Sequence, residues 1–142
     1  MSVRLGDTGP EFVFGPVTRE DIVRYSGATY DFVPFHHDGG YARAHGYPTV
    51  FAHGPFSFGV LGSFLTRWFG PSSVREYGVR FREQVWPGDV LRAEGRVVEL
   101  LASDTGGQHR ARVEVALVNQ HGQPAVSGSA VVVLPDEHEP DS

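Results

Sequence analysis

The chain has 142 residues, enough for one domain with a hydrophobic core and too few for two, since domains typically have about 100 to 150 residues. A hydrophobic fraction of 40% excludes a disordered chain, and a formal net charge of −5 argues against a nucleic-acid-binding protein, which would carry a basic face. All twelve cationic side chains are arginine and no cysteine is present, which excludes a Schiff-base lysine, a disulfide framework and a thiolate nucleophile.

The first ten residues lack the apolar run of a secretory signal peptide. No segment approaches the roughly 20 apolar residues that a membrane-spanning helix needs. The absence of cysteine is compatible with a reducing compartment. We therefore expect a cytoplasmic protein that does not enter a membrane.

The first predicted elements in chain order are a strand and a helix. Glu11–Phe14 has the pattern of a short strand. Thr18 is followed three residues later by Asp21, which is a variant of the capping box that marks a helix start. The sequence therefore predicts a short helix from Arg19 to about Ser26.

An irregular segment follows this helix. The run Gly27–His37 has neither a helical nor an alternating period, and Pro34 lies within it, so we expect an ordered loop rich in aromatic residues. Asp38 can accept hydrogen bonds from the start of a second short helix. Gly46 is placed to end that helix.

The next predicted helix is the most informative element. It opens at Gly54-Pro55, because proline is favoured in the first helical turn, and it stops at Gly70. Between these points nearly every side chain is apolar until Arg67. A helix of about 15 residues with no polar face is too short to span a membrane, so it must be buried inside a globular fold.

Four alternating segments can cover this helix, and turn residues separate them. The segments lie near residues 77–82, 91–97, 110–117 and 126–134, and the turns are Trp86–Asp89 and Asn119–Gly122. Their inward positions are Tyr77, Val79, Phe81, Leu91, Ala93, Val97, Ala111, Val113, Val115 and Leu117. The last segment is apolar on both faces, as a central or interface strand would be. The pattern predicts an α+β domain over residues 1–134, with an antiparallel sheet around a central helix and an acidic, flexible tail over 135–142.

Two features could carry chemistry. Asp31 and His36 are five residues apart in the aromatic, proline-containing loop, although polar loop residues often serve only as caps. The segment Ala52–Pro55 enters the buried helix, where unpaired N–H groups could stabilise an oxyanion, or where the chain could simply turn. A metal site would need ligands such as His36, His37, Asp38 and His53. They lack the spacing of a metal motif, so we expect no metal site.

In order along the chain, these motifs resemble the MaoC-like enoyl-thioester hydratases, whose pattern is approximately Ser-Gly-Asp-x-Asn-Pro-(Ile/Leu)-His-x-Asp followed by Ala-His-Gly. The resemblance covers roughly residues 10 to 134. The matching positions are Asp31, Pro34, His36, Asp38, Tyr41-Ala42-Arg43, Gly46, Ala52-His53-Gly54, Val79-Arg80-Phe81-Arg82 and Pro87-Gly88-Asp89.

The resemblance implies a hot-dog fold and reversible hydration of a trans-2-enoyl thioester carried by coenzyme A or an acyl carrier protein. It implies that Asp31 and His36 activate the water, while Gly54 and His53 bind the thioester oxygen. It implies a homodimer, or a heterodimer with a related hot-dog chain, and no metal or organic cofactor. We expect the substrate pocket to include Phe32, Val33, Phe35, Phe56 and Ser57.

The chain departs from the family pattern beside the expected acid. Tyr30 stands where the family has glycine, Val33 where it has asparagine, and Pro55 where it more often has a long apolar residue. These changes leave a second hypothesis open, a non-catalytic helper subunit that pairs with a related chain. A hot-dog thioesterase is a weaker alternative, because such enzymes place a carboxylate on or near the central helix and residues 56–69 contain none.

Overall fold

The computed structural model describes residues 3–102 and 108–135. Five strands form one sheet in the order β1-β3-β4-β5-β2, and every neighbouring pair in it is antiparallel. The elements in chain order are β1 (Val13–Phe14), α1 (Arg19–Thr29), the 3-10 helix η1 (Pro34–His36), α2 (Gly39–Ala44), α3 (Gly54–Phe69), β2 (Val74–Phe81), β3 (Leu91–Leu101), β4 (Arg110–Val118) and β5 (Pro124–Val133).

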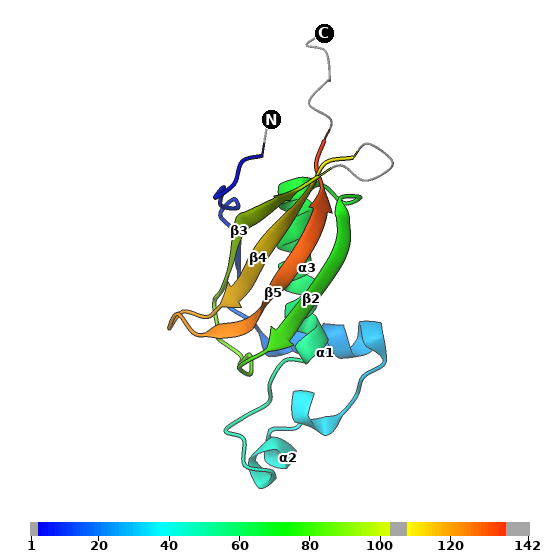
Figure 1. Ribbon diagram of the computed structural model, residues 1–142. Coiled ribbons are helices and arrows are strands. Elements are labelled where there is room, and N and C mark those ends of the chain that lie inside the picture. Colours follow the sequence, from blue (N-terminus) through cyan, green and yellow to red (C-terminus); the bar gives the residue numbers. More distant parts are fainter. Residues whose placement is uncertain (1–2, 103–107, 136–142) are drawn as a thin grey trace.

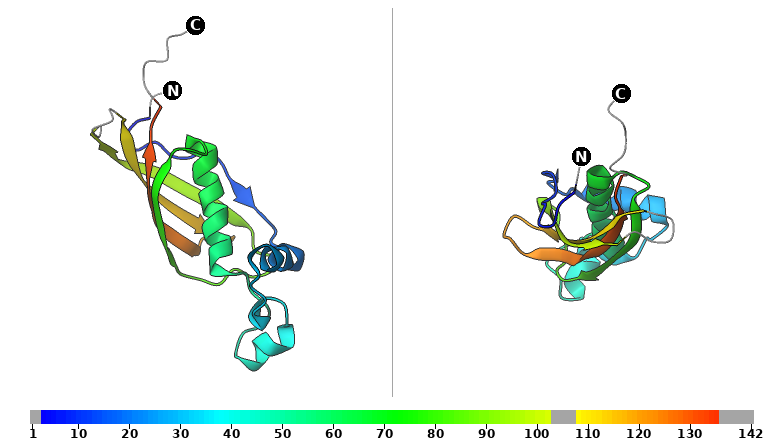
Figure 2. Two further views of the ribbon diagram at one scale, coloured as in Figure 1. Left: turned by 90° about the vertical axis from the view of Figure 1, so that its right-hand side faces the viewer. Right: turned by 45° about the horizontal axis from the view of Figure 1, so that its top comes forward.

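Helix α3 is the centre of the fold. It begins and ends where the sequence predicts, with proline in its first turn and Gly70 at its C-cap with a φ of 101°. The sheet lies across one side of this helix, as the left view of Figure 2 shows. The helix side chains that are fully buried against the sheet are Leu61, Phe64 and Leu65. The expected hot-dog arrangement, a sheet wrapped around a buried helix, is confirmed.

Strands β3 and β4 bury the residues that their alternation predicts, whereas in β2 the expected inward residue Phe81 is exposed. The two long strands β3 and β4 pair over almost their whole length, so that Ala93 faces Leu117 and Val97 faces Val113. All four of these side chains are buried. Strand β5 lies between β4 and β2, which explains why its second half is apolar on both faces.

Glycine allows the sheet to approach the central helix closely. A Cβ atom at Gly95 would lie 2.7 Å from Trp68 and 2.8 Å from Phe64, which is closer than carbon atoms pack. Gly9, whose N–H donates to the Gly95 carbonyl, contacts the same ring, and a Cβ atom there would overlap Phe64. The Phe64 ring therefore packs against two adjacent backbone segments that have no side chain at the point of contact.

The helices that precede α3 gather at the end of the sheet where α3 begins (Figure 1). The capping box at the start of α1 is present, because the Thr18 hydroxyl accepts from Asp21 N–H and the Asp21 carboxylate accepts from Thr18 N–H. Helix α1 continues three residues beyond Ser26, to Thr29. Asp38 caps α2 by accepting a hydrogen bond from Tyr41 N–H.

Two expected segments differ in the structure. The strand expected over Glu11–Phe14 is only two residues long, Val13–Phe14, and it pairs with the start of β3. The irregular loop contains the short helix η1 in addition to the end of α1. The tail expected over 135–142 lies outside the described residues except for Pro135. In the described ranges, no helix is long and apolar enough to cross a membrane.

Candidate active site

The backbone before Asp31 has an unusual conformation. Tyr30 follows α1 and lies in the left-handed region, with a φ of 56°, a conformation that normally favours glycine. The chain then turns back, so that Asp31 N–H donates to the Ser26 carbonyl at 3.2 Å. One carboxylate oxygen of Asp31 accepts from Val33 N–H at 3.3 Å. The glycine of the family pattern therefore corresponds to a backbone requirement that Tyr30 meets under strain.

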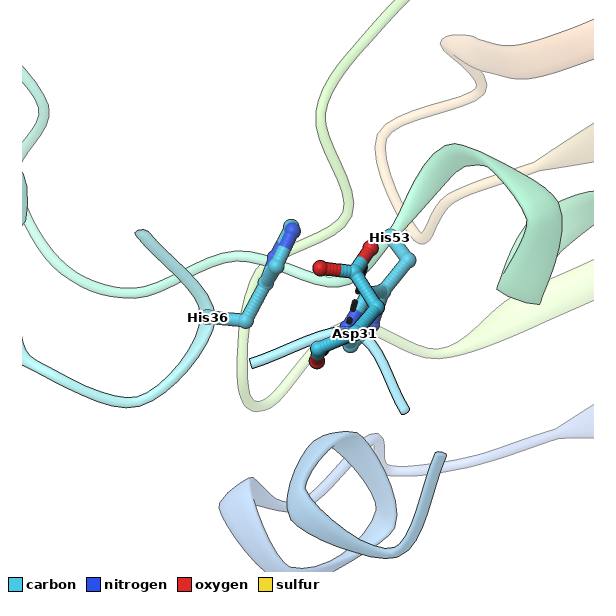
Figure 3. A group of neighbouring side chains, drawn as sticks. All are labelled: Asp31, His36 and His53. Carbon is cyan, nitrogen blue, oxygen red and sulfur yellow. Dashed lines mark hydrogen bonds and ion pairs between the residues drawn. The ribbon is translucent and has the colours of Figure 1, made fainter. Parts of the chain in front are cut away.

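The orientation of His36 leaves one ring nitrogen available as a base. Its Nδ1 lies 2.7 Å from the carbonyl oxygen of Phe51, which can only accept, so Nδ1 carries the proton. The Nε2 atom is then an unprotonated acceptor in the neutral ring. One carboxylate oxygen of Asp31 and one ring nitrogen each from His36 and His53 lie within 4.8 Å of one another, and Figure 3 shows these three side chains together.

His53 is buried beneath this pair, with a side chain that is 1% exposed, whereas that of Asp31 is 41% exposed. Its Nε2 lies 3.0 Å from the Ser26 hydroxyl, 3.4 Å from the Asp31 carbonyl and 3.9 Å from the Asp31 carboxylate. Its ring stacks on that of His36 with the centroids 3.7 Å apart. Burial lowers the pKa of His53 and the neighbouring His36 lowers it further, while Asp31 opposes part of this shift. His53 is therefore neutral at neutral pH.

The three groups are better arranged for hydrogen bonding than for holding a metal ion. The imidazole lone pairs lie in the planes of the rings, and the His36 and His53 rings are within 24° of parallel. The two lone pairs therefore lie in nearly parallel planes. A metal ion about 2.1 Å from both nitrogens would have to lie in both ring planes at once. The group also differs from the one weighed from the sequence, because Asp31 takes the place of His37 and Asp38.

The start of α3 forms one wall of a small hollow. The hollow has a volume of about 230 Å³, and its lining includes His53, Gly54, Ser57, Phe81 and Arg82. A Cβ atom at Gly54 would come within 3.3 Å of the Phe81 ring, so glycine leaves more space between the start of α3 and Phe81 in this hollow. No acceptor in the described part of the chain takes the Gly54 N–H, whereas Phe56 N–H already donates to the His53 carbonyl. Gly54 is thus an available backbone donor at a helix N-terminus.

The residues expected in the substrate pocket are spread over three environments. Ser57 lines the hollow, and Phe56 packs in the core, edge-on to the rings of Phe14 and Tyr25. Phe35 belongs to an aromatic cluster outside the hollow, with Tyr41, His45, Tyr47 and Phe51. Phe32 and Val33 are 59% and 45% exposed. The structure therefore brings only Ser57 of this set to the hollow.

A larger groove of about 1070 Å³ lies on the outer face of the sheet. Its charged lining residues are Arg80, Arg82, Glu94, Arg96 and Glu114, and neither Asp31, His36 nor His53 lines it. Alternating arginine and glutamate on the exposed face of an antiparallel sheet is typical of a solvated surface. Of the three site residues, His53 lines the smaller hollow, whereas Asp31 and His36 line neither of these two cavities.

Sequence reasoning missed Ser26 and the carbonyl oxygen of Phe51. Ser26 is 2% exposed and its hydroxyl contacts a histidine 27 residues away. The Phe51 carbonyl sets the tautomer of His36 from 15 residues away. Neither contact has a local sequence signal, because each depends on how α1, η1 and the start of α3 pack together.

Two characterised proteins are similar to this chain in sequence. The peroxisomal hydratase-dehydrogenase-epimerase of Saccharomyces cerevisiae is 35% identical over 103 residues, which are 68% of this chain and 11% of the yeast protein. This chain therefore spans about a tenth of that relative. The 3-hydroxybutyryl-CoA dehydratase of Methylorubrum extorquens is 29% identical over 128 residues, which are 88% of this chain and 78% of that protein.

Two solved structures share the fold and part of the sequence. The unliganded R-hydratase PhaJ1 from Pseudomonas aeruginosa has a TM-score of 0.82 and 26% identity, over 95% of this chain and 84% of that chain. A chain of the ChsH1-ChsH2 complex from Mycobacterium tuberculosis has a TM-score of 0.79 and 26% identity, over 95% of this chain and 100% of that chain. The family model described as "MaoC like domain" matches residues 6–119. The chain therefore belongs to the MaoC-like domain family of hydratases and dehydratases.

Proposed function

We propose that this protein catalyses the reversible addition of water to a trans-2-enoyl thioester, giving a 3-hydroxyacyl thioester. The observation that carries the proposal is the proximity of the Asp31 carboxylate and one ring nitrogen of His36. A water that makes two hydrogen bonds of about 2.8 Å at a tetrahedral angle spans acceptors about 4.6 Å apart. The limit of 4.8 Å among the site atoms is compatible with one shared water.

In this mechanism, the pair holds the water and one member removes its proton. His36 Nε2 has a lone pair for this step, and Asp31 accepts the second hydrogen bond of the water. The hydroxide oxygen bonds to the β-carbon, the carbon–carbon π electrons move toward the thioester, and the α-carbon then receives the proton that the pair removed from the water. Water is added without any change of oxidation state.

The thioester oxygen gains negative charge as the enolate forms. We assign its stabilisation to the Gly54 N–H, which points from the start of α3 and has no acceptor in residues 3–102 or 108–135. One such donor contributes about 3 kcal/mol to the stability of a transition state. His53 was expected to share this role, but its Nε2 already contacts Ser26 and Asp31 inside the protein.

The substrate carrier and the assembly are part of the same proposal. The named relatives include a 3-hydroxybutyryl-CoA dehydratase, which favours a thioester of coenzyme A over one of an acyl carrier protein. Strand β2 is at the edge of the sheet, and Phe81 at its end is 56% exposed beside the hollow. We expect a homodimer, or a heterodimer with a related chain, to cover this surface.

A helper subunit is the second candidate function. Two observations favour it. Near Asp31, Tyr30 is in a left-handed conformation where the family has glycine, and Val33 stands where the family has asparagine. One structural neighbour was solved as a complex of ChsH1 with ChsH2. A helper chain would be inert alone and would raise the activity of a partner.

The test is the loss of the conjugated enoyl-thioester absorbance when the purified protein is mixed with a short trans-2-enoyl-CoA. We expect Asp31→Asn and His36→Gln each to lower turnover by at least about a hundredfold, the low end for an acid/base residue. Asp38→Asn is the matched control, because it removes a carboxylate from the same segment and asparagine caps a helix equally well. Turnover at the wild-type rate in both site variants would remove the assignment. A wild-type protein inert on several chain lengths would favour the helper subunit.

A further inference from the structure

Ser26 is connected to Asp31 through its backbone. It lies in the last turn of α1, and its carbonyl oxygen accepts from the N–H groups of both Tyr30 and Asp31. Two consecutive donors on one carbonyl hold the chain in the tight turn that leads out of the helix. The N–H side of Asp31 is thereby fixed to the end of α1.

The hydroxyl of Ser26 reaches the other side of Asp31 through His53. His53 Nε2 faces the Ser26 hydroxyl at 3.0 Å and the Asp31 carbonyl at 3.4 Å. A carbonyl oxygen only accepts, so Nε2 carries the proton and donates to both oxygens. Nδ1 then has no proton, and it has no hydrogen-bond partner among the described residues. Asp31 is consequently held at its N–H by the Ser26 carbonyl and at its own carbonyl by the His53 ring.

His53 also supports the second member of the pair. Its ring lies between two others: it stacks on His36 with a centroid distance of 3.7 Å, and Tyr25 lies 4.8 Å away in a tilted contact. Since the side chain is 1% exposed, no water replaces a lost contact. A rotation of the His53 ring would therefore move both Asp31 and His36 relative to each other.

We propose that Ser26 is a positioning residue whose hydroxyl fixes His53, and that His53 in turn holds Asp31 and His36 at the separation that the shared water needs. The proposal rests on the proposed hydratase function. Without the hydroxyl, the His53 N–H keeps only the 3.4 Å contact to the Asp31 carbonyl, which is long for a hydrogen bond. The rotation of the ring about its Cβ–Cγ bond is then held only by this contact and by the packing against His36 and Tyr25.

Three substitutions separate the hydroxyl from the shape of the side chain. Ser26→Ala removes the hydroxyl, Ser26→Thr keeps it, and Ser26→Val has the shape of threonine without it. We expect Ala and Val to lower kcat about tenfold with KM unchanged, well short of the roughly hundredfold cost of a misplacement of about 1 Å. Thr should retain more activity than Val. Ser63→Ala on α3 is the control, because it removes an exposed hydroxyl bonded to the Gly59 carbonyl.

A second measurement does not depend on activity, and its first part needs only the wild-type protein. Nitrogen-15 NMR of the histidine side chains of the wild-type protein should show His53 with a proton on Nε2 and none on Nδ1. That proton should exchange slowly with water, and Ser26→Ala should speed its exchange.

These outcomes decide separately on the two proposals. A wild-type protein that is inert on enoyl thioesters refutes the hydratase function, while the NMR result still decides the role of Ser26. A wild-type proton on His53 Nδ1, an unchanged kcat in Ser26→Ala, or equal rates for Thr and Val would overturn the role of Ser26.

Discussion

Replacing Tyr30 with glycine should stabilise the protein. Tyr30 has a φ of 56° and a ψ of 26°, a left-handed conformation that costs a residue with a Cβ atom about 1 to 2 kcal/mol. Its side chain is 86% exposed, so its removal forfeits little buried surface. Glycine loses more backbone entropy on folding, about 0.5 to 1 kcal/mol. The balance is a gain of about 0.5 to 1 kcal/mol in the free energy of unfolding.

The assay is equilibrium unfolding in urea, read as a rise in the midpoint at a constant slope. For a chain of this length, the same gain raises Tm by about 3 °C. Tyr30→Ala is the matched control, because it removes the ring and keeps the Cβ atom in the left-handed region. A Tyr30→Gly protein no more stable than Tyr30→Ala would refute the strain argument.

Two further predictions concern stability. Gly95→Ala should lower the free energy of unfolding by about 2 kcal/mol, because its Cβ would overlap Trp68 and Phe64. Gly59→Ala, whose Cβ would lie in open space within α3, should raise it by about 0.5 to 1 kcal/mol. Thermal unfolding measures both changes. Burial lowers the pKa of His53 in the folded protein, so this imidazole binds a proton more readily in the unfolded chain. The contribution of His53 to stability is therefore full above about pH 6.5, and it is lost as the pH falls below that value. The unfolding free energy of His53→Gln, measured at about pH 7.5 and 5.5, should show a smaller loss on acidification than that of the wild type.

Local sequence chemistry predicted the helix starts and the faces of the strands. The capping box of Thr18 and Asp21 and the Gly54-Pro55 opening of α3 depend on neighbouring residues, so the sequence contains the full signal. The alternation in β4 likewise predicted its buried side chains. The sheet order was implied only by the family resemblance, because alternation determines the face of a residue and not the neighbour of a strand.

The rest depended on packing between distant segments. The sequence predicted an end of α1 at about Ser26, yet the helix continues to Thr29, and the Tyr30 N–H closes the last turn on the Ser26 carbonyl. Phe81 has the alternation of an inward residue but is 56% exposed, because the sheet ends beside the hollow. The burial of His53 was not predicted either, since it follows from contacts with residues on α1 and η1.

The central claim is that Asp31 and His36 act on the same water, and a double-variant cycle tests it most directly. The turnover of Asp31→Asn/His36→Gln is compared with that of each single variant on the same enoyl-CoA. Groups that act as one unit are non-additive, so the double variant should be hardly slower than the slower single variant. Losses that multiply in the double variant would show that the two residues act independently and would contradict the shared water.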